Sequence, residues 1–257
     1  MMGVQNLAWH NLGQRLVQMA ESMLTLVYPP QCFVCLQCEQ SLSCRFLCEG
    51  CLARVLEADL PPLRSWKNSE ELHPEIQDCE SDLAAWYYED SMMALIPRMK
   101  YQNRPAIAKV FAEIAAARLQ APMNTVLLSA EKGGFILVPV PLHPLRQRER
   151  GYNQSLLIAR AFSKKWQLAM LPRALRRTRF TQSQAKLNAT ERAKNVNGVF
   201  VPGDAERIAG RTVLLVDDVI TTGATVSACA RALQQTGAAR VIALALARAG
   251  RGLKLKR

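Results

Sequence analysis

The chain has 257 residues, of which 49% are hydrophobic, enough for one large domain or a medium-sized one with a small appendage. No apolar run approaches the ~20 residues that a membrane span requires, so we expect no membrane span. The net charge of +12 is unevenly placed: residues 31–90 carry twelve acidic and four basic side chains, whereas residues 141–200 carry thirteen basic and two acidic ones. Almost all of the positive excess therefore lies in the second half.

Apolar residues recur at helical spacing from Val4 to Val27 and predict an amphipathic helix that ends before Pro29-Pro30. The polar face of this helix carries few cations, which favours packing on the protein itself over lying on a membrane or a partner. The segment has neither the basic start nor the small-residue cleavage site of a secretory signal. We therefore expect a cytoplasmic protein.

Six of the eight cysteines lie between Cys32 and Cys51. Two C-x-x-C pairs, separated by twelve residues, can place four thiolates around a zinc ion, which stabilises a segment too short to fold by itself. The expected zinc ligands are Cys32, Cys35, Cys48 and Cys51. Cys38 and Cys44 lie between the pairs, and either could replace a ligand. Disulfides are disfavoured because no export signal precedes them.

Residues 61–82 are expected to be a linker, because they contain Pro61-Pro62, Pro74 and scattered acids with little periodicity. The linker would separate an N-terminal module at 1–60 from a larger domain at 83–250, with a basic tail at 251–257. Apolar runs predict strands that alternate with helices in the larger domain, which indicates an α/β fold. The expected strands lie near 83–88, 135–141, 213–216 and 241–247, and the expected helices near 105–119, 154–168 and 224–235.

A basic stretch follows the strand predicted at 135–141. Arg146, Arg148 and Arg150 should open onto the same sheet edge as any polar groups at the other strand ends. Guanidinium groups suit phosphate oxygens, so we expect these three arginines to bind an anion. His143 could act as an acid or a base, but a lone histidine beside two prolines is more often structural. A second basic segment, 173–197, is polar and could close over a bound ligand.

The segment 212–226 joins a strand, two acids and a turn of small residues. Val213 to Val216 form an apolar run typical of a strand buried on both faces of a parallel sheet. Asp217 and Asp218 follow directly, where they could take ribose hydroxyls or a divalent metal. Backbone N–H groups at the start of the next helix bind anions. The residues expected to hold a phosphate there are Thr221, Thr222, Gly223, Ala224 and Thr225. An acidic strand end before an ordinary capped helix is the alternative.

This segment resembles the phosphoribosyl pyrophosphate (PRPP) signature of the type I phosphoribosyltransferases. In that family the acids contact the ribose 2- and 3-hydroxyls, and the loop after them holds the 5-phosphate. The resemblance implies these roles for Asp217 and Asp218 and for residues 221–225, with Mg²⁺ bound together with PRPP. It also implies an α/β fold with a mostly parallel sheet and helices on both faces, to which the small N-terminal zinc-binding module is joined.

Other motifs look like those of one subgroup, the ComF/GntX family. They are Val-Pro-Val-Pro-Leu-His-Pro at 138–144, Arg-x-Arg-x-Arg-Gly-Tyr-Asn-Gln at 146–154, Thr178-x-x-x-Gln182-Ser183-Gln184, Arg192-x-x-Asn195-Val196 and Phe200. Tyr152 stands where phenylalanine is common. The family is associated with natural competence and, in some members, with the use of external DNA. The resemblance implies that the stretch with the three arginines is the diphosphate loop.

Two hypotheses about function follow. The first is an enzyme that transfers phosphoribosyl from PRPP to an unidentified acceptor, which requires no covalent nucleophile. The second is a non-enzymatic adaptor that binds single-stranded DNA or proteins of the DNA-uptake machinery, with PRPP at most a regulator. The basic charge favours nucleic acid, but aromatic residues are only 6% of the chain and offer no stacking platform.

Overall fold

The computed structural model describes residues 31–36, 46–66, 78–101, 105–128, 133–179, 198–204 and 206–250. Several expectations lie outside these residues: the amphipathic helix at 4–27, Cys38 and Cys44, the motifs at 182–184 and 192–196, and the basic tail. In the part of the chain that is described, no helix combines the length and the apolar character needed to cross a membrane.

The described residues fall into two compact units, one up to Glu57 and one from Ala58 onward. The first unit contains the helix α2 (Glu49–Glu57), which begins directly after Cys48. The second unit contains a five-stranded sheet in the order β1-β2-β7-β6-β3. Its strands are β1 (Arg64–Ser65), β2 (Ser81–Tyr87), β3 (Phe135–Pro139), β6 (Thr212–Ile220) and β7 (Arg240–Arg248). All neighbours pair in parallel except the short edge strand β1, which is antiparallel to β2.

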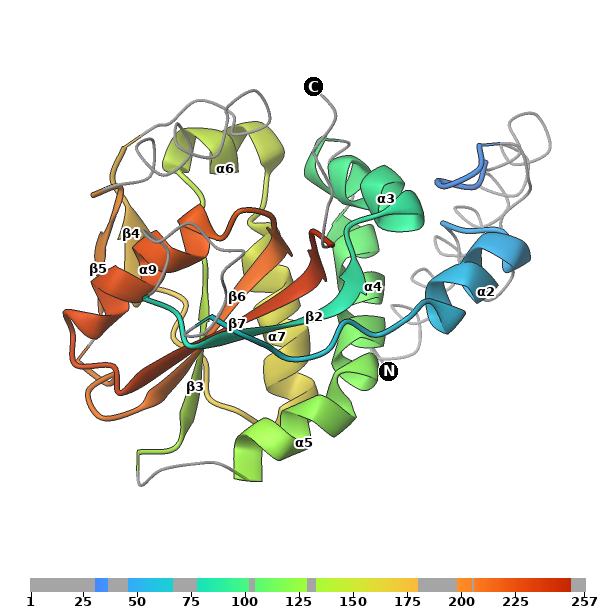
Figure 1. The fold of residues 1–257 in the computed structure, drawn as a ribbon. Helices are drawn as coiled ribbons and strands as arrows, with labels where there is room; N and C mark the ends of the chain where they lie inside the picture. The colour runs from blue at the N-terminus through green and yellow to red at the C-terminus, as the bar shows by residue number, and fades with distance from the viewer. Residues whose placement is uncertain are drawn as a thin grey trace, which may run out of the picture. The chain divides into compact units, whose positions relative to one another are not determined.

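Helices cover both faces of the sheet (Figure 1). On one face α9 packs over alternate core residues of β6 and β7, among them Val213, Leu215, Val241 and Ala243. Residues of a strand point alternately to opposite faces, so Leu214 and its neighbours face the other layer, where α7 contacts β3 and β6 and α4 contacts β2. The helices of this unit are α3 (Asp90–Tyr101), α4 (Pro105–Arg118), α5 (Gln120–Leu128), α6 (Pro144–Arg150), α7 (Gln154–Trp166) and α9 (Ala224–Gln234). The α/β fold with a mostly parallel sheet is thus confirmed.

A second, two-stranded sheet pairs β4 (Leu175–Arg177) with β5 (Phe200–Pro202) in antiparallel fashion. It packs against α9, and Leu175 and Phe200 are buried in the same core as that helix. The basic stretch after β3 forms the helix α6. Pro144 occupies the first turn of α6, where a proline costs no hydrogen bond, and Gly151 ends the helix with a φ of 76°.

The strand β6 is longer than its apolar run predicts. β6 continues through Asp217 and Asp218 to Ile220, because it keeps pairing with β7 as far as Arg248. Its other neighbour, β3, ends at Pro139 opposite Val216. The two acids therefore lie inside the strand rather than after it, but beyond the point where β3 stops.

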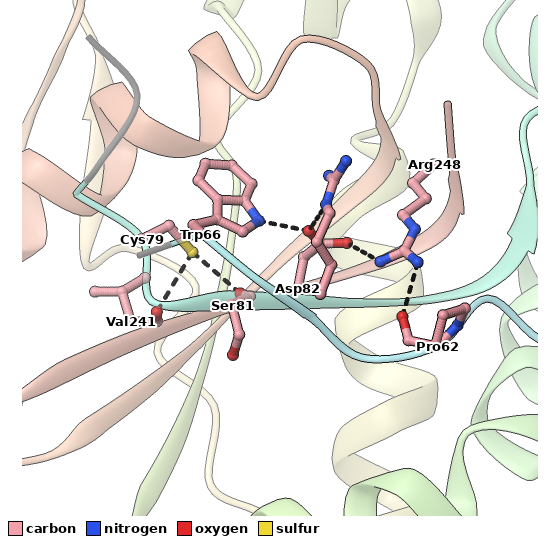
Figure 2. A network of polar contacts seen from close by, with 8 residues as sticks. Pro62, Trp66, Cys79, Ser81, Asp82, Val241 and Arg248 are labelled. Atoms are coloured by element: carbon pink, nitrogen blue, oxygen red, sulfur yellow. Dashed lines mark hydrogen bonds and ion pairs between the residues drawn. The ribbon is translucent and has the colours of Figure 1, made fainter. Parts of the chain in front are cut away.

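A buried carboxylate fastens the start of β2 to its neighbours. Asp82 is fully buried; its Oδ1 accepts hydrogen bonds from Arg64 Nε at 2.7 Å and Trp66 Nε1 at 2.5 Å. Its Oδ2 accepts from Arg248 Nη1 at 2.9 Å, and the same guanidinium reaches the carbonyl oxygen of Pro62 (Figure 2). The segment before β1 and the end of β7 are thereby joined through one side chain.

Asp82→Ala is expected to lower the free energy of unfolding by about 3–5 kcal/mol, because it leaves the Arg248 charge buried without its carboxylate. Denaturant unfolding of the full chain measures this change. The control is Asp59→Ala, which removes an exposed carboxylate and should change stability little. A loss below about 1 kcal/mol for Asp82→Ala would show that the network contributes little.

Candidate functional site

The acid pair lies where the sheet is open. Asp217 is partly buried and Asp218 is 6% exposed. β3 ends opposite Val216, so the two acids lie beyond the end of the strand that neighbours β6 on that side. This is the carboxyl edge of a parallel sheet, where ligands of open α/β folds bind. Both acids thus occupy the edge that the sequence predicted for them.

Three donors hold the two carboxylates. Oδ1 of Asp217 accepts hydrogen bonds from the hydroxyl of Ser155 at 3.0 Å and from the backbone N–H of Asp218 at 2.8 Å. Oδ1 of Asp218 forms an ion pair with Lys100 Nζ at 2.9 Å. Ser155 is the second residue of α7, and its own N–H is bonded by the N-cap residue Asn153. The start of α7 and the end of α3 are therefore anchored to the acid pair.

The environment makes a charge on Asp217 costly. Burial and the neighbouring charge of Asp218 raise the pKa of Asp217 to about 7. The charge of Lys100 and the two hydrogen bonds to Asp217 oppose this rise without cancelling it. Near neutral pH Asp217 is consequently poised between its protonated and ionised forms, and perturbed carboxyl groups of this kind are common at functional sites.

The turn after β6 leads into the N-terminus of α9. Gly223 is the N-cap residue, with a φ of 83° that a residue with a side chain rarely adopts, and it makes no side-chain cap hydrogen bond. The hydroxyl of Thr222 lies 3.5 Å from the N–H of Ala224. Helix dipole and N–H groups here favour a bound anion. The structure thus places the residues predicted to hold a phosphate, 221–225, directly after the acid pair.

The three arginines of α6 separate into two sets. Arg146 and Arg150 are one helical turn apart and partly buried, whereas Arg148 points elsewhere and is exposed. Arg150 lies close enough to Lys100 for the two positive charges to interact, and its Nη1 donates to Oε1 of Gln154 at 2.8 Å. Arg146 pairs with the exposed Glu149. His143 caps α6 by accepting the N–H of Leu145 at 3.2 Å, in line with a structural role.

Two cations near the acids were not predicted as site residues. Lys100 lies in the last turn of α3, as does Arg98, and the sequence does not show which of the two cations approaches the acids. Arg177, on β4, has its guanidinium 5.5 Å from the ring centre of Phe200. Burial lowers the pKa of Arg177, and the charges of Asp217 and Arg146 both act on it. These contacts join segments far apart in the chain, so no local pattern in the sequence marks them.

Four cysteines of the first unit meet as the spacing predicted. The sulfur atoms of the cluster lie within 4.8 Å of one another. Cys35 Sγ and Cys48 Sγ are 3.9 Å apart, close to the ~3.8 Å between sulfurs around a tetrahedral zinc ion. Burial and the sulfurs of Cys48 and Cys32 raise the pKa of Cys51 to about 12, so the thiolate form needs a cation. The members, Cys32, Cys35, Cys48 and Cys51, could bind zinc.

Asp217→Asn is expected to stabilise the ligand-free protein at pH 8. A carboxyl group whose pKa is raised to about 7 binds a proton more tightly when folded, so the wild type loses stability as pH rises from about 4 to about 7. The amide has no such loss. The variant should gain at least about 1 kcal/mol at pH 8, and less at pH 5, in denaturant unfolding. Asp204→Asn, at an exposed position, is the control. If the variant gains no stability at pH 8, or gains the same amount at pH 5 and pH 8, the raised pKa of Asp217 is contradicted.

Comparison with known proteins agrees with this geometry. Residues 98–257 match the family described as Phosphoribosyl transferase domain. Competence protein F of Haemophilus influenzae is 31% identical over 164 residues, which cover 63% of this chain and 70% of that protein. DNA utilization protein YhgH of Escherichia coli is 33% identical over 158 residues, which cover 60% and 66%. Competence protein ComFC of Streptococcus pneumoniae is 26% identical over 213 residues, which cover 78% and 86%. The chain therefore belongs to the phosphoribosyl transferase domain family and, within it, to the ComF-type proteins.

Proposed function

We propose that the protein binds PRPP at the carboxyl edge of β6 and acts in the use of external DNA in the cytoplasm. One observation carries the PRPP proposal: two adjacent carboxylates lie near the end of β6, and the turn that follows this strand leads to Gly223, the N-cap residue of α9. Carboxylates that accept hydrogen bonds from ribose hydroxyls, next to backbone N–H groups that donate to phosphate oxygens, match a ribose 5-phosphate. The role in DNA use is supported by the names of the relatives, Competence protein F and DNA utilization protein.

Each part of the site has a role in this proposal. Asp217 and Asp218 accept the ribose hydroxyls, directly or through Mg²⁺, and the backbone of 221–225 encloses the 5-phosphate. Arg146 and Arg150, which lie on one side of α6, bind the diphosphate with charge-assisted hydrogen bonds. Arg148 is exposed and adds only longer-range attraction for the anion.

We further propose that PRPP is a substrate whose phosphoribosyl group passes to an acceptor. The bond from the anomeric carbon to the diphosphate breaks as the bond to the acceptor forms, and the transition state resembles an oxocarbenium ion. The protein holds the ribose in place and neutralises the departing diphosphate through its arginines. Mg²⁺ bound together with PRPP would shield the diphosphate.

A non-enzymatic adaptor for single-stranded DNA is the second candidate. Arg173, Arg176 and Arg179 are exposed around β4, where they can release counterions from nucleic-acid phosphates. Arg177 of the same segment is partly buried beside Phe200 and suits this role less. Affinity for single strands that falls steeply with salt, in a protein that does not bind PRPP, would favour the adaptor and its partners in DNA uptake.

The cysteine cluster is proposed to hold one structural zinc ion. Metal binding would stabilise the first unit, in which the described residues outside the cluster have few buried side chains. Arg54 Nη2 lies 2.9 Å from Cys51 Sγ and would offset part of the negative charge of a four-thiolate site.

Replacing both acids, Asp217→Asn with Asp218→Asn, is expected to weaken PRPP binding at least about tenfold, because charged hydrogen bonds contribute ~1.5–3 kcal/mol each. The measurement is calorimetric titration of PRPP with Mg²⁺. Asp59→Asn with Asp204→Asn removes the same charge from exposed positions and should bind like the wild type. A wild type that does not bind at millimolar PRPP overturns the proposal. Equal binding by the acid variant moves the site elsewhere.

Metal analysis of the purified chain should find about one zinc ion per molecule. Cys32→Ser or Cys48→Ser should lose the metal and unfold the first unit, because three thiolates and a hydroxyl bind zinc less tightly. Cys79→Ala alters a cysteine outside the cluster and should retain the zinc. A metal-free wild type whose first unit is fully folded would rule out this role.

A further inference from the structure

The ammonium group of Lys100 is in direct contact with the acid pair. Its Nζ lies 2.9 Å from Oδ1 of Asp218, and the two side chains are 23% and 8% exposed. An ion pair so little exposed to water is weakly screened, so its geometry is fixed more firmly than that of a surface pair. Among the described residues, Lys100 is the cation that forms an ion pair with either acid.

The backbone around Lys100 is held from two sides. The preceding residue, Met99, is buried in the core, and its carbonyl oxygen accepts the hydroxyl hydrogen of Tyr152. Tyr152 follows Gly151, the residue that ends α6, and precedes the N-cap of α7. The backbone next to Lys100 is therefore hydrogen-bonded to the segment that carries Arg150 and Ser155, and this contact fixes the position of Lys100 in the site.

Lys100 remains charged in this position. Burial alone would lower the pKa of its ammonium group, but the charge of Asp218 and the hydrogen bond to it raise the pKa overall. A positive charge 2.9 Å from a carboxylate oxygen takes one of the places from which a divalent ion would coordinate that carboxylate. A metal ion entering there would have to displace Lys100 or accept its repulsion at short range.

We propose that Lys100 is the built-in counter-ion of the acid pair and keeps divalent metal off Asp218. The inference rests on the proposed PRPP site and refines it: the ribose hydroxyls meet the carboxylates directly, and Mg²⁺ arrives on the diphosphate without binding either acid. Lys100 is thus a positioning residue, which holds Asp218 ready for a hydroxyl instead of a metal ion.

The test is titration of the zinc-loaded full chain with Mn²⁺ alone, followed by electron paramagnetic resonance. Mn²⁺ prefers carboxylate oxygens to thiolates, so the cysteine cluster does not compete for it. We expect weak binding by the wild type and a new site in Lys100→Met, at least about tenfold tighter. The double variant Lys100→Met with Asp218→Asn should lose that site. Lys100→Arg keeps the charge, and Lys109→Met removes an exposed lysine from α4; both should behave like the wild type.

Equal Mn²⁺ affinity in the wild type and Lys100→Met overturns the proposal. The wild type can also overturn it without that variant: tight Mn²⁺ binding that Asp218→Asn removes would show that the carboxylate takes metal beside Lys100. Because these titrations contain no PRPP, their outcome is independent of whether the protein binds PRPP. Failure of the PRPP proposal appears instead as a wild type that shows no calorimetric response to PRPP.

Discussion

Two neighbouring carboxylates on one strand repel each other, and the surrounding structure is arranged to hold them in place. Asp217 accepts hydrogen bonds from the hydroxyl of Ser155 and from the N–H of Asp218, and Asp218 forms an ion pair with Lys100. These contacts tie the start of α7 and the end of α3 to β6. The compensation is incomplete, since the pKa of Asp217 is still raised to about 7. The ionised form of Asp217 is therefore unfavourable in the ligand-free protein. A ligand that donates hydrogen bonds to this carboxylate would stabilise it.

β6 runs past the end of one of its two neighbouring strands. β7 supports β6 to its end, whereas β3 stops four residues earlier, at the partner of Val216. The chain leaving β3 forms the short helix α6, which His143 caps, Pro144 begins and Gly151 ends. The charge of Lys100 on α3 acts on both acids, and the charge of Arg177 on β4 acts on Asp217. The same edge of the sheet thus carries carboxylates, which suit the hydroxyls of a sugar phosphate, and cations, which suit its phosphate groups.

The sequence predicts this arrangement where the signal is local. Spacing predicted the four cysteines that meet in the first unit, and an apolar run followed by two acids predicted the strand, its edge and the next helix. The sequence could not predict the length of β6, because the end of this strand depends on its pairing with β7. Nor could it separate Lys100 from Arg98, or Arg177 from Arg176, since tertiary packing alone decides which cation turns toward the acids.

Hydrogen exchange of backbone amides can locate the PRPP site on the folded chain. With PRPP and Mg²⁺ present, exchange should slow in the peptides that contain 217–226 and 146–155, because the first encloses the 5-phosphate and the second faces the diphosphate. Peptides of α5 should exchange as before. Protection that appears elsewhere, or none at saturating PRPP, would contradict a ribose phosphate site at the carboxyl edge of β6.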